Sequence, residues 1–531
     1  MLTPTTQTAA PAYTASIITS LVPDRLTKRA SLVGGKVVKE KAGNMLEGRV
    51  KRLAFAGPTE FAAMLTGLES GQALVFGVAA QAEAHVVTKA KVSGTSIART
   101  DAFLPWPAGP GVLMLDYDPA PGVDPMSRDA FRALLLSVVP GLEAAPMVIG
   151  SSASSHLYDT ATGDCVKAGG GLRAYVFVAD ARDIPRAGAA LFARLWLAGH
   201  GFGLVSASGQ MLVRGPVDAS VWQSARLDFA AGMDCVAPLE QRRPAPDVYN
   251  QDAPPFDTKA LLLDLTAAEG KDFDNLKAGE RERLKPEIEA TRETWVSGRV
   301  GLHVAAHKAR TNETLGEADL LKLKKLYRGA VEGGKLFADF LLELGDGSTA
   351  SVESVLNNPD KYHNTYIPDP VEPEYGSNKS VAWINLRSGG RPFIWSHAHG
   401  GRRFELLRAS ERQECAAGDL PRLVKAADER LALEGQVFSR GGELVRVAGG
   451  EILTVTAPWL KNQLEELFEF VKWHNTGQKW VRAGAPEELP SRVLAARGEW
   501  TVPELRGVVF GPLLRPDGTL LDQPGYDAAT G

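Results

Sequence analysis

The alternation of apolar and polar positions between residues 111 and 217 predicts a repeated order of strands and helices. The expected strands lie at 112–115, 146–149, 173–178, 203–206 and 211–217, and the expected helices at 127–139 and 187–197. The order strand, helix, strand, strand, helix, strand predicts a compact α+β domain. Polar residues follow several of these strands, so we expect the chemistry of this domain to lie at one edge of its sheet.

The first of these strands leads into Asp116, Tyr117 and Asp118. Because side chains alternate between the two faces of a strand, Asp116 and Asp118 are expected to point the same way and Tyr117 the other way. Two adjacent carboxylates are costly to keep ionised away from water, and a divalent cation bound by their oxygens removes that cost. The pattern indicates a metal site at the strand end. The alternative is a solvated Asp pair that caps a turn.

Changes of composition divide the chain into four parts. The expected parts are a catalytic domain at 1–250, a helical domain at 256–345, a β-rich hairpin region at 346–419 and a mixed α/β region at 420–531. A Pro-rich stretch at 253–256 separates the first two parts. Within the last part, the spacing of apolar residues predicts helices at 420–433 and 460–473.

Charge is nearly balanced, with 59 Lys and Arg against 63 Asp and Glu, so contact with nucleic acid has to be local. One candidate is a basic hairpin predicted at 26–41, which carries Lys28 and Arg29. Another is the cluster of Trp395, Arg402 and Arg403, which combines stacking and phosphate-binding groups. For both, the alternative is a solvated hairpin without a ligand.

The three cysteines, Cys165, Cys235 and Cys415, lack C-x-x-C spacing, which argues against a disulfide framework and a cysteine zinc site. No apolar run is long enough to span a membrane, and residues 1–20 lack the basic start and apolar core of an export signal. We therefore expect a soluble cytoplasmic protein without a membrane partner.

Three motifs in order resemble those of the archaeo-eukaryotic primase superfamily, and most of all the primase-polymerases of phages and plasmids. They are the D-Y-D of Asp116 and Asp118, a Ser-rich loop with His156, and Asp218 in R-G-P-V-D-A-S-V. Phrases such as A-R-T-D-A-F, R-L-D-F-A-A-G, S-H-A-H-G-G and L-R-P-D-G-T-L-L-D-Q-P-G-Y-D-A-A-T-G are similar to the same proteins. The resemblance runs from about residue 96 to the end of the sequence.

The resemblance implies an RRM-like catalytic domain that makes or extends primers on single-stranded DNA from nucleoside triphosphates. It implies that Asp116, Asp118 and Asp218 hold Mg²⁺ or Mn²⁺ and are the catalytic residues. It also implies a phage- or plasmid-encoded protein in a bacterial host, with a helicase domain or protein as a further partner. We expect residues 256–531 to raise affinity for the template without supplying metal ligands.

The second motif does not decide which residue contacts the triphosphate. Its histidine usually follows a Gly-rich turn, where this chain has Arg173, whereas His156 keeps the Ser-x-His spacing through Ser154. The guanidinium of Arg173 could bind phosphate in a bidentate pair. Arg99, just before the central strand, is a further candidate.

Two other functions explain part of the pattern. A non-catalytic replication initiator or helicase-loading module would bind DNA through the α+β domain without polymerising. A sugar transferase would use Asp116 and Asp118 to hold a nucleotide-sugar but gives Asp218 no role.

Overall fold

The computed structural model describes residues 13–531 apart from 41–44, 377, 388–390, 417, 449, 512, 516, 517, 519, 522–525, 528 and 529. The fold is mixed α+β. The expectation about an export signal in residues 1–20 falls mostly outside the described residues. Part of the C-terminal segment L-R-P-D-G-T-L-L-D-Q-P-G-Y-D-A-A-T-G, which carries some of the sequence resemblance, also falls outside them. Among the described residues, no helix is both long and apolar enough to cross a membrane.

The chain groups into two compact units. The first contains residues 1–204 and 212–284, and the second contains 205–211 and 285–531. The predicted boundary near residue 250 differs from this division, because the chain continues into the long helix α5 (Ala267–Thr311), and the division falls inside it.

The central sheet of the first unit has the strand order β17-β9-β12-β8, with every pair antiparallel. Helix α2 links β8 to β9, and α3 follows β12. The elements are β8 (Gly111–Tyr117), α2 (Arg128–Val138), β9 (Met147–Ser151), β12 (Leu172–Val178), α3 (Ile184–Leu197) and β17 (Asp247–Tyr249). The Ser127 side chain accepts a hydrogen bond from the Ala130 N–H and caps α2.

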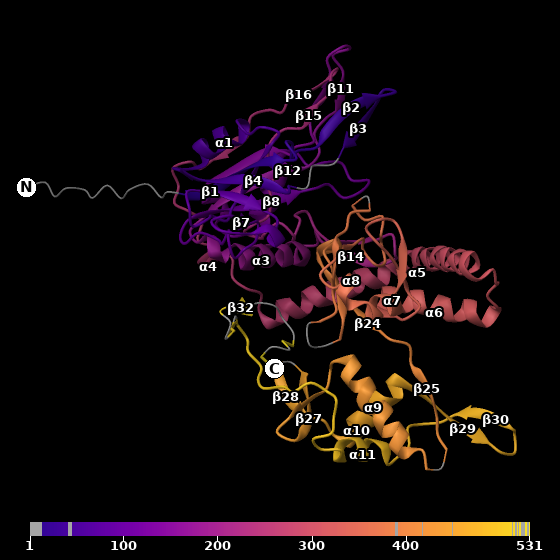
Figure 1. Ribbon diagram of the computed structural model, residues 1–531. Helices are drawn as coiled ribbons and strands as arrows, with labels where there is room; N and C mark the ends of the chain where they lie inside the picture. Colours follow the sequence, from indigo (N-terminus) through magenta and orange to yellow (C-terminus); the bar gives the residue numbers. More distant parts are fainter. Residues whose placement is uncertain are drawn as a thin grey trace, which may run out of the picture. The chain divides into compact units, whose positions relative to one another are not determined.

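Both faces of this sheet are covered, which explains the unbroken apolar run in β8. On one face Tyr117 packs on Phe131 of α2, with 5.1 Å between ring centroids. On the other face Tyr175 and Phe177 of β12 pack on Phe61 of α1 (Pro58–Thr66). Figure 1 shows α1 and α3 on opposite sides of these strands. The predicted alternation is confirmed, since Asp116 lies on the face opposite Tyr117.

A second sheet, with the order β5-β1-β4-β6-β7, covers the Phe177 face. Its strands are β1 (Tyr13–Val22), β4 (Glu47–Phe55), β5 (Gln72–Val75), β6 (Glu83–Val87) and β7 (Ile97–Ala98). Tyr13 stacks on Phe55 and meets the edge of Phe177 at 4.9 Å between centroids. The short helix α4 (Thr258–Leu261) completes the unit near the start of α5.

Two small sheets form a projection that we call the wing, seen in Figure 1 extending from the rest of the first unit. The wing contains β2 (Arg29–Val33), β3 (Lys36–Glu40), β10 (Leu157–Asp159), β11 (Cys165–Lys167), β15 (Asp234–Cys235) and β16 (Leu239–Gln241). The hairpin predicted at 26–41 is observed as β2 and β3. Gly34 and Gly35 form its turn with φ values of 56° and 75°, which glycine adopts without strain.

The strand predicted at 211–217 is shorter in the structure. β13 (Phe202–Val205) pairs with β14 (Met211–Arg214), which ends at Gly215-Pro216 because proline has no N–H to continue the ladder. Asp218 therefore lies in a loop and not at a strand end, which corrects the expectation.

In the second unit, helices and strands share one core. Val300 of α5 and Tyr327 of α6 (Glu317–Gly333) are buried in the same cluster as Ile384, Ile394 and Phe404 of the five-stranded sheet β18-β24-β23-β22-β21. The strands and short helices of this part are β18 (Lys335–Phe337), β19 (Leu341–Glu343), β20 (Thr349–Ser351), α7 (Val352–Asn357), α8 (Pro359–Tyr362), β21 (Tyr366–Ile367), β22 (Ala382–Asn385), β23 (Phe393–Ser396) and β24 (Arg402–Leu407). The helical and hairpin regions expected as separate parts are thus packed together from residue 285 onward.

The C-terminal part has its own core around α9, α10 and α11. Its elements are β25 (Glu411–Glu414), α9 (Leu420–Glu434), β26 (Phe438–Arg440), β27 (Glu443–Ala448), β28 (Glu451–Thr454), α10 (Ala457–Leu467), β29 (Phe468–His474), β30 (Lys479–Arg482), α11 (Leu489–Ala495), β31 (Leu513–Leu514) and β32 (Leu520–Leu521). The helix predicted at 460–473 is wrong beyond Leu467, where the chain becomes strand β29.

Candidate functional site

Asp116 lies at the end of β8, directly opposite Arg173 of β12. The Arg173 Nε is 3.4 Å from Asp116 Oδ1, and its Nη1 is 2.5 Å from Asp228 Oδ1. The Tyr175 hydroxyl donates to the other Asp228 oxygen at 2.9 Å. Burial alone would lower the pKa of Arg173, but Asp228 and then Asp116 outweigh it and raise that pKa. Arg173 therefore stays charged and forms ion pairs with two carboxylates, those of Asp116 and Asp228.

Asp218 is held beside Asp116 through the backbone. Its N–H donates to the Asp116 carbonyl at 2.9 Å, and the Trp222 indole N–H donates to the Met114 carbonyl at 3.0 Å. The loop after β14 thus follows the edge of β8, where Trp222 packs so closely on Gly188 of α3 that no Cβ would fit there. This packing places a third carboxylate near the pair predicted from sequence.

The carboxylate of Asp118 is crowded by negative charge. Its pKa is raised by surrounding protein atoms that exclude water, then by Asp116; Asp218 also raises it, whereas Arg173 opposes the shift. A Cβ at Gly171 would lie 2.9 Å from Asp118 Oδ1, so the glycine leaves room for this side chain. The ordinary way to relieve such crowding is a cation.

The carboxylates do not form a ready metal cage. Among the described residues, no three His, Cys, Asp or Glu side chains are grouped so that they could hold a metal ion. Each Asp218 oxygen also accepts a hydrogen bond at 2.9 Å, one from the Ser220 N–H and the other from the Ser220 hydroxyl. The metal site at Asp116, Asp118 and Asp218 therefore stays a prediction.

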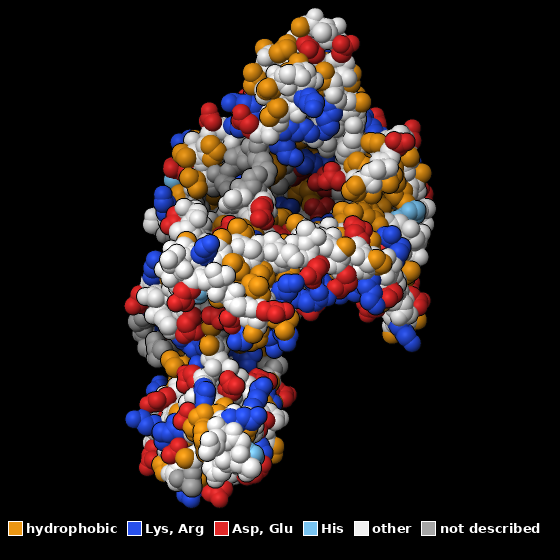
Figure 2. Space-filling model, turned by 90° about the vertical axis from the view of Figure 1, so that its right-hand side faces the viewer, with side chains coloured by type: hydrophobic (Ala, Val, Ile, Leu, Met, Phe, Trp, Pro, Cys, Tyr) orange, Lys and Arg blue, Asp and Glu red, His pale blue; other side chains and the backbone are white. Residues whose placement is uncertain are grey.

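Three lysines lie close enough to interact electrostatically with Asp118 or with one another: Lys28, just before β2, and Lys39 and Lys167 of the wing. The pKa of Lys167 is lowered to about 8 by burial, then by Lys39, with a smaller effect of Lys28. The charge of Asp118 opposes this shift, so the carboxylate and the lysines influence one another directly. Figure 2 shows Lys and Arg side chains gathered in its upper part, where the wing lies. Such a cluster of like charges is suited to a polyanion.

The sequence analysis named Lys28 but missed Lys39 and Lys167. A signal was present, since Lys39 belongs to the predicted basic hairpin and Lys167 comes just before Gly169-Gly170-Gly171. What the sequence did not reveal is the pairing of β10 with β11 and β16, which places Val166 of β11 in one apolar cluster with Leu32 and Val37 of the β2-β3 hairpin.

His156 lies in the Ser-rich loop with φ 57° and its Nε2 is 3.0 Å from the Ser151 hydroxyl. Its pKa is lowered by burial, then by Arg128 and Arg243. Ser154 accepts from the Lys167 ammonium at 2.7 Å through its carbonyl and at 3.2 Å through its hydroxyl. The loop therefore connects the histidine candidate to the lysine cluster.

A cavity of about 680 Å³ lies over the face of the central sheet that carries Asp116 and Arg173. Gly150 and Arg173, which are partners across β9 and β12, belong to its lining, and Ser151, Gln241 and Arg243 add polar groups. Arg173 pairs across the sheet with Asp116 on one side and Gly150 on the other. The cavity therefore lies beside the ion pair between Arg173 and Asp116. Its size is in the range of small-ligand sites.

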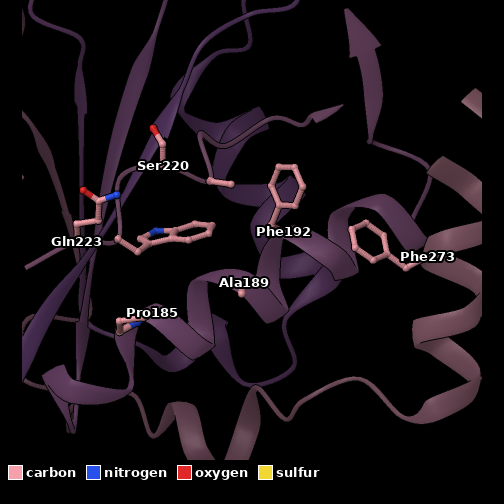
Figure 3. A pocket seen from close by; sticks show the side chains of 8 residues that line it. Pro185, Ala189, Phe192, Ser220, Gln223 and Phe273 are labelled. Atoms are coloured by element: carbon pink, nitrogen blue, oxygen red, sulfur yellow. The ribbon is translucent and has the colours of Figure 1, made fainter. Parts of the chain in front are cut away.

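A smaller pocket of about 320 Å³ lies beside the Asp218 loop. In Figure 3, Phe192 and Phe273 lie on one side of this pocket and Ser220 and Gln223 on the other. Its lining is mainly apolar, so it adds a hydrophobic surface next to the third carboxylate.

Two other basic candidates of the first unit are engaged in structural contacts. The Arg99 guanidinium donates to the Ala225 carbonyl at 2.8 Å, and Arg29 pairs with Asp234 at 2.6 Å. Burial, then the charge of Arg226, lowers the pKa of Arg99. Neither contact brings these arginines to Asp116 or Asp118.

The predicted cluster of the second unit is divided between two faces. Trp395 and Arg403 are cross-strand partners, and both are exposed. Arg402 is one residue away and lies on the opposite face, where its guanidinium donates to Gln210 and to the Val331 carbonyl. Arg402 thus has a structural role, because strand alternation turns it toward the interior.

No protein-family model, curated protein or solved structure matches this chain.

Proposed function

We propose that the first unit is a primase-polymerase, a nucleotidyltransferase that makes or extends primers on a single-stranded DNA template. The observation that carries this proposal is the gathering of Asp116, Asp118 and Asp218 at one end of β8 beside three lysines. Carboxylates suited to cations next to ammonium groups suited to phosphate are what transfer from a nucleoside triphosphate requires.

The topology supports an RRM-like core. β8, α2, β9, β12 and α3 follow the first five elements of a β-α-β-β-α-β fold, with the wing strands β10 and β11 inserted between β9 and β12. Of these three strands of the central sheet, β12 lies between β8 and β9. Asp116 and Arg173 lie on the sheet face opposite α2.

The donor set fits Mg²⁺ or Mn²⁺ in its chemistry. Asp116 and Asp118 offer hard carboxylate oxygens, and the raised pKa of Asp118 marks an excess of negative charge that a divalent cation would relieve. Asp218 would join them as the third carboxylate after exchanging a Ser220 contact. Bound metal would supply stabilisation of the attacking and leaving oxygens.

The chain's own groups would handle the rest of the substrate. Lys28, Lys39 and Lys167 would meet phosphate oxygens, while Arg173 keeps Asp116 oriented through its contact with Asp228. The cavity over Gly150 would accept the nucleoside end. Single-stranded template and nucleoside triphosphates are thus the proposed partners, whereas a helicase partner and a phage or plasmid origin rest on the sequence resemblance alone.

The proposal is tested by incorporation of labelled nucleotides on a defined single-stranded template, with and without a primer. Ribonucleotides and deoxynucleotides are each supplied with Mg²⁺ or Mn²⁺, and extension of the labelled product is measured on a gel. We expect incorporation with at least one pairing of nucleotide and metal. Binding of template without any incorporation would instead identify a non-catalytic replication module.

Replacing Lys167 by Gln is expected to weaken nucleotide binding about tenfold, because one charge-assisted phosphate contact is lost. Binding of the wild type should weaken as pH rises through about 8, where Lys167 loses its proton, and the Lys167→Arg variant should not show this loss. Titration calorimetry with a nucleoside triphosphate at about pH 7 and about pH 9 measures both effects.

Lys36→Gln is the matched control, since Lys36 is an exposed lysine of the wing at the turn of the β2-β3 hairpin. Equal affinities of the wild type, Lys167→Gln and Lys36→Gln would remove Lys167 from the binding site.

A further inference from the structure

The hairpin formed by β29 and β30 exposes two tryptophans at its end. Trp473 and Trp480 are 48% and 37% exposed, although large aromatic side chains are normally buried. Figure 1 shows β29 and β30 extending away from α9, α10 and α11. The sheet is anchored at its other end by Phe468 and Phe470, which are buried in the core around these helices.

The two tryptophans form one aromatic surface. They are direct cross-strand partners, with ring centroids 5.5 Å apart and planes inclined by 71°. The Arg412 guanidinium lies 5.5 Å from the Trp480 ring, and Val471 on the same face is buried. These contacts restrict both rings while Trp473 stays about half exposed, so little conformational entropy remains to be lost on stacking.

The same segment is strongly basic. Its eleven residues from Lys472 to Arg482 contain Lys472, Lys479 and Arg482 but no Asp or Glu. By the strand register, Arg482 shares the tryptophan face, whereas Lys472 and Lys479 lie on the opposite face of the same narrow hairpin. Glu414 and Glu469 lie toward the anchored end of the sheet, where they pair with Val471 and Arg412 in the strand register. Cations therefore flank the aromatic surface on both sides.

We propose that this hairpin binds single-stranded nucleic acid, with bases stacked on Trp473 and Trp480 and phosphates contacting Lys472, Lys479 and Arg482. An aromatic surface bordered by cations matches the alternation of bases and phosphates along a single strand. Paired bases in a duplex do not offer their faces, so a single strand is the matching form. The inference does not depend on catalysis by the first unit, which lies elsewhere in the chain.

The test is fluorescence anisotropy of a labelled oligothymidylate titrated with the full chain. Trp473→Ala and Trp480→Ala are each expected to weaken binding between about fivefold and a hundredfold, while Trp473→Phe keeps most of the affinity. Replacing both Lys472 and Lys479 by Gln should reduce the slope of log Kd against log salt by about 1.4, because two phosphate contacts are lost.

Tyr366→Ala is the control, since Tyr366 is an exposed aromatic residue on a strand of the other sheet, and its affinity should equal that of the wild type. Unchanged affinity in both tryptophan variants, with thermal melting also unchanged, would overturn the proposal. The proposal would also be overturned if the tryptophan variants lost binding to anionic lipid vesicles, or lost self-association of the chain, while their affinity for the oligothymidylate stayed unchanged.

Discussion

Replacing Asp116 and Asp118 together by Ala is expected to lower nucleotide incorporation at least about a thousandfold, or ~4 kcal/mol of transition-state stabilisation. The two carboxylates would be the main anionic ligands of the cations, and Asp218 alone could not replace both of them. Extension of a labelled primer under the most active nucleotide and metal conditions measures the effect.

Folding should survive this double change. Asp118 is crowded by negative charge, so removing it relieves repulsion, and Arg173 keeps its ion pair with Asp228 when its contact with Asp116 is lost. Asp124→Ala, an exposed Asp in the loop after β8, is the matched control and should retain wild-type activity. If the double variant melted like the wild type and still extended primers, the two-carboxylate assignment would have to be abandoned.

The sequence predicted the local part of this site well. The apolar run of β8 and the alternation of Asp116 with Tyr117 depend only on strand geometry, and both are present in the structure. The Ser127 cap of α2 is equally local. Such features follow from neighbouring residues, so a single sequence contains the information for them.

The sequence did not predict the tertiary contacts of the site. Asp228 was not singled out, because its tie to Arg173 joins segments that are separated by 55 positions and meet only after the sheet forms. Lys167 reaches Ser154 and the neighbouring lysines only through pairing of the wing strands. These contacts depend on register between distant strands, which no local pattern encodes.

One local pattern was also misread. Leu460, Leu464 and Leu467 have helical spacing and are buried in α10, but the period changes to two from Phe468, with Phe468 and Phe470 buried and Glu469 exposed. A helix and a strand joined without a loop give one continuous apolar pattern. The change of period was the only signal, and it places the two tryptophans on an exposed hairpin and not on a helix.

Replacing Arg173 by Ala is expected to lower the free energy of unfolding by about 3–5 kcal/mol, because it leaves Asp228 buried without its cationic partner. Urea unfolding measures this loss. Arg182→Ala is the control, since Arg182 is 63% exposed in its ion pair with Asp180 and its replacement should leave the free energy of unfolding nearly unchanged. Adding Asp228→Ala to the Arg173 variant should restore part of the stability, since the uncompensated charge is removed.

The same variant separates the two roles considered for Arg173. A residue that only contacts the triphosphate would lose nucleotide affinity while the stability of the protein stayed unchanged. If Arg173 instead links Asp116 and Asp228 through ion pairs, the variant should lose much of its stability. It should also lose turnover, because Asp116 is no longer held in position. Stability within about 1 kcal/mol of the wild type, together with a raised nucleotide KM, would return Arg173 to the substrate and leave Asp228 without its proposed partner.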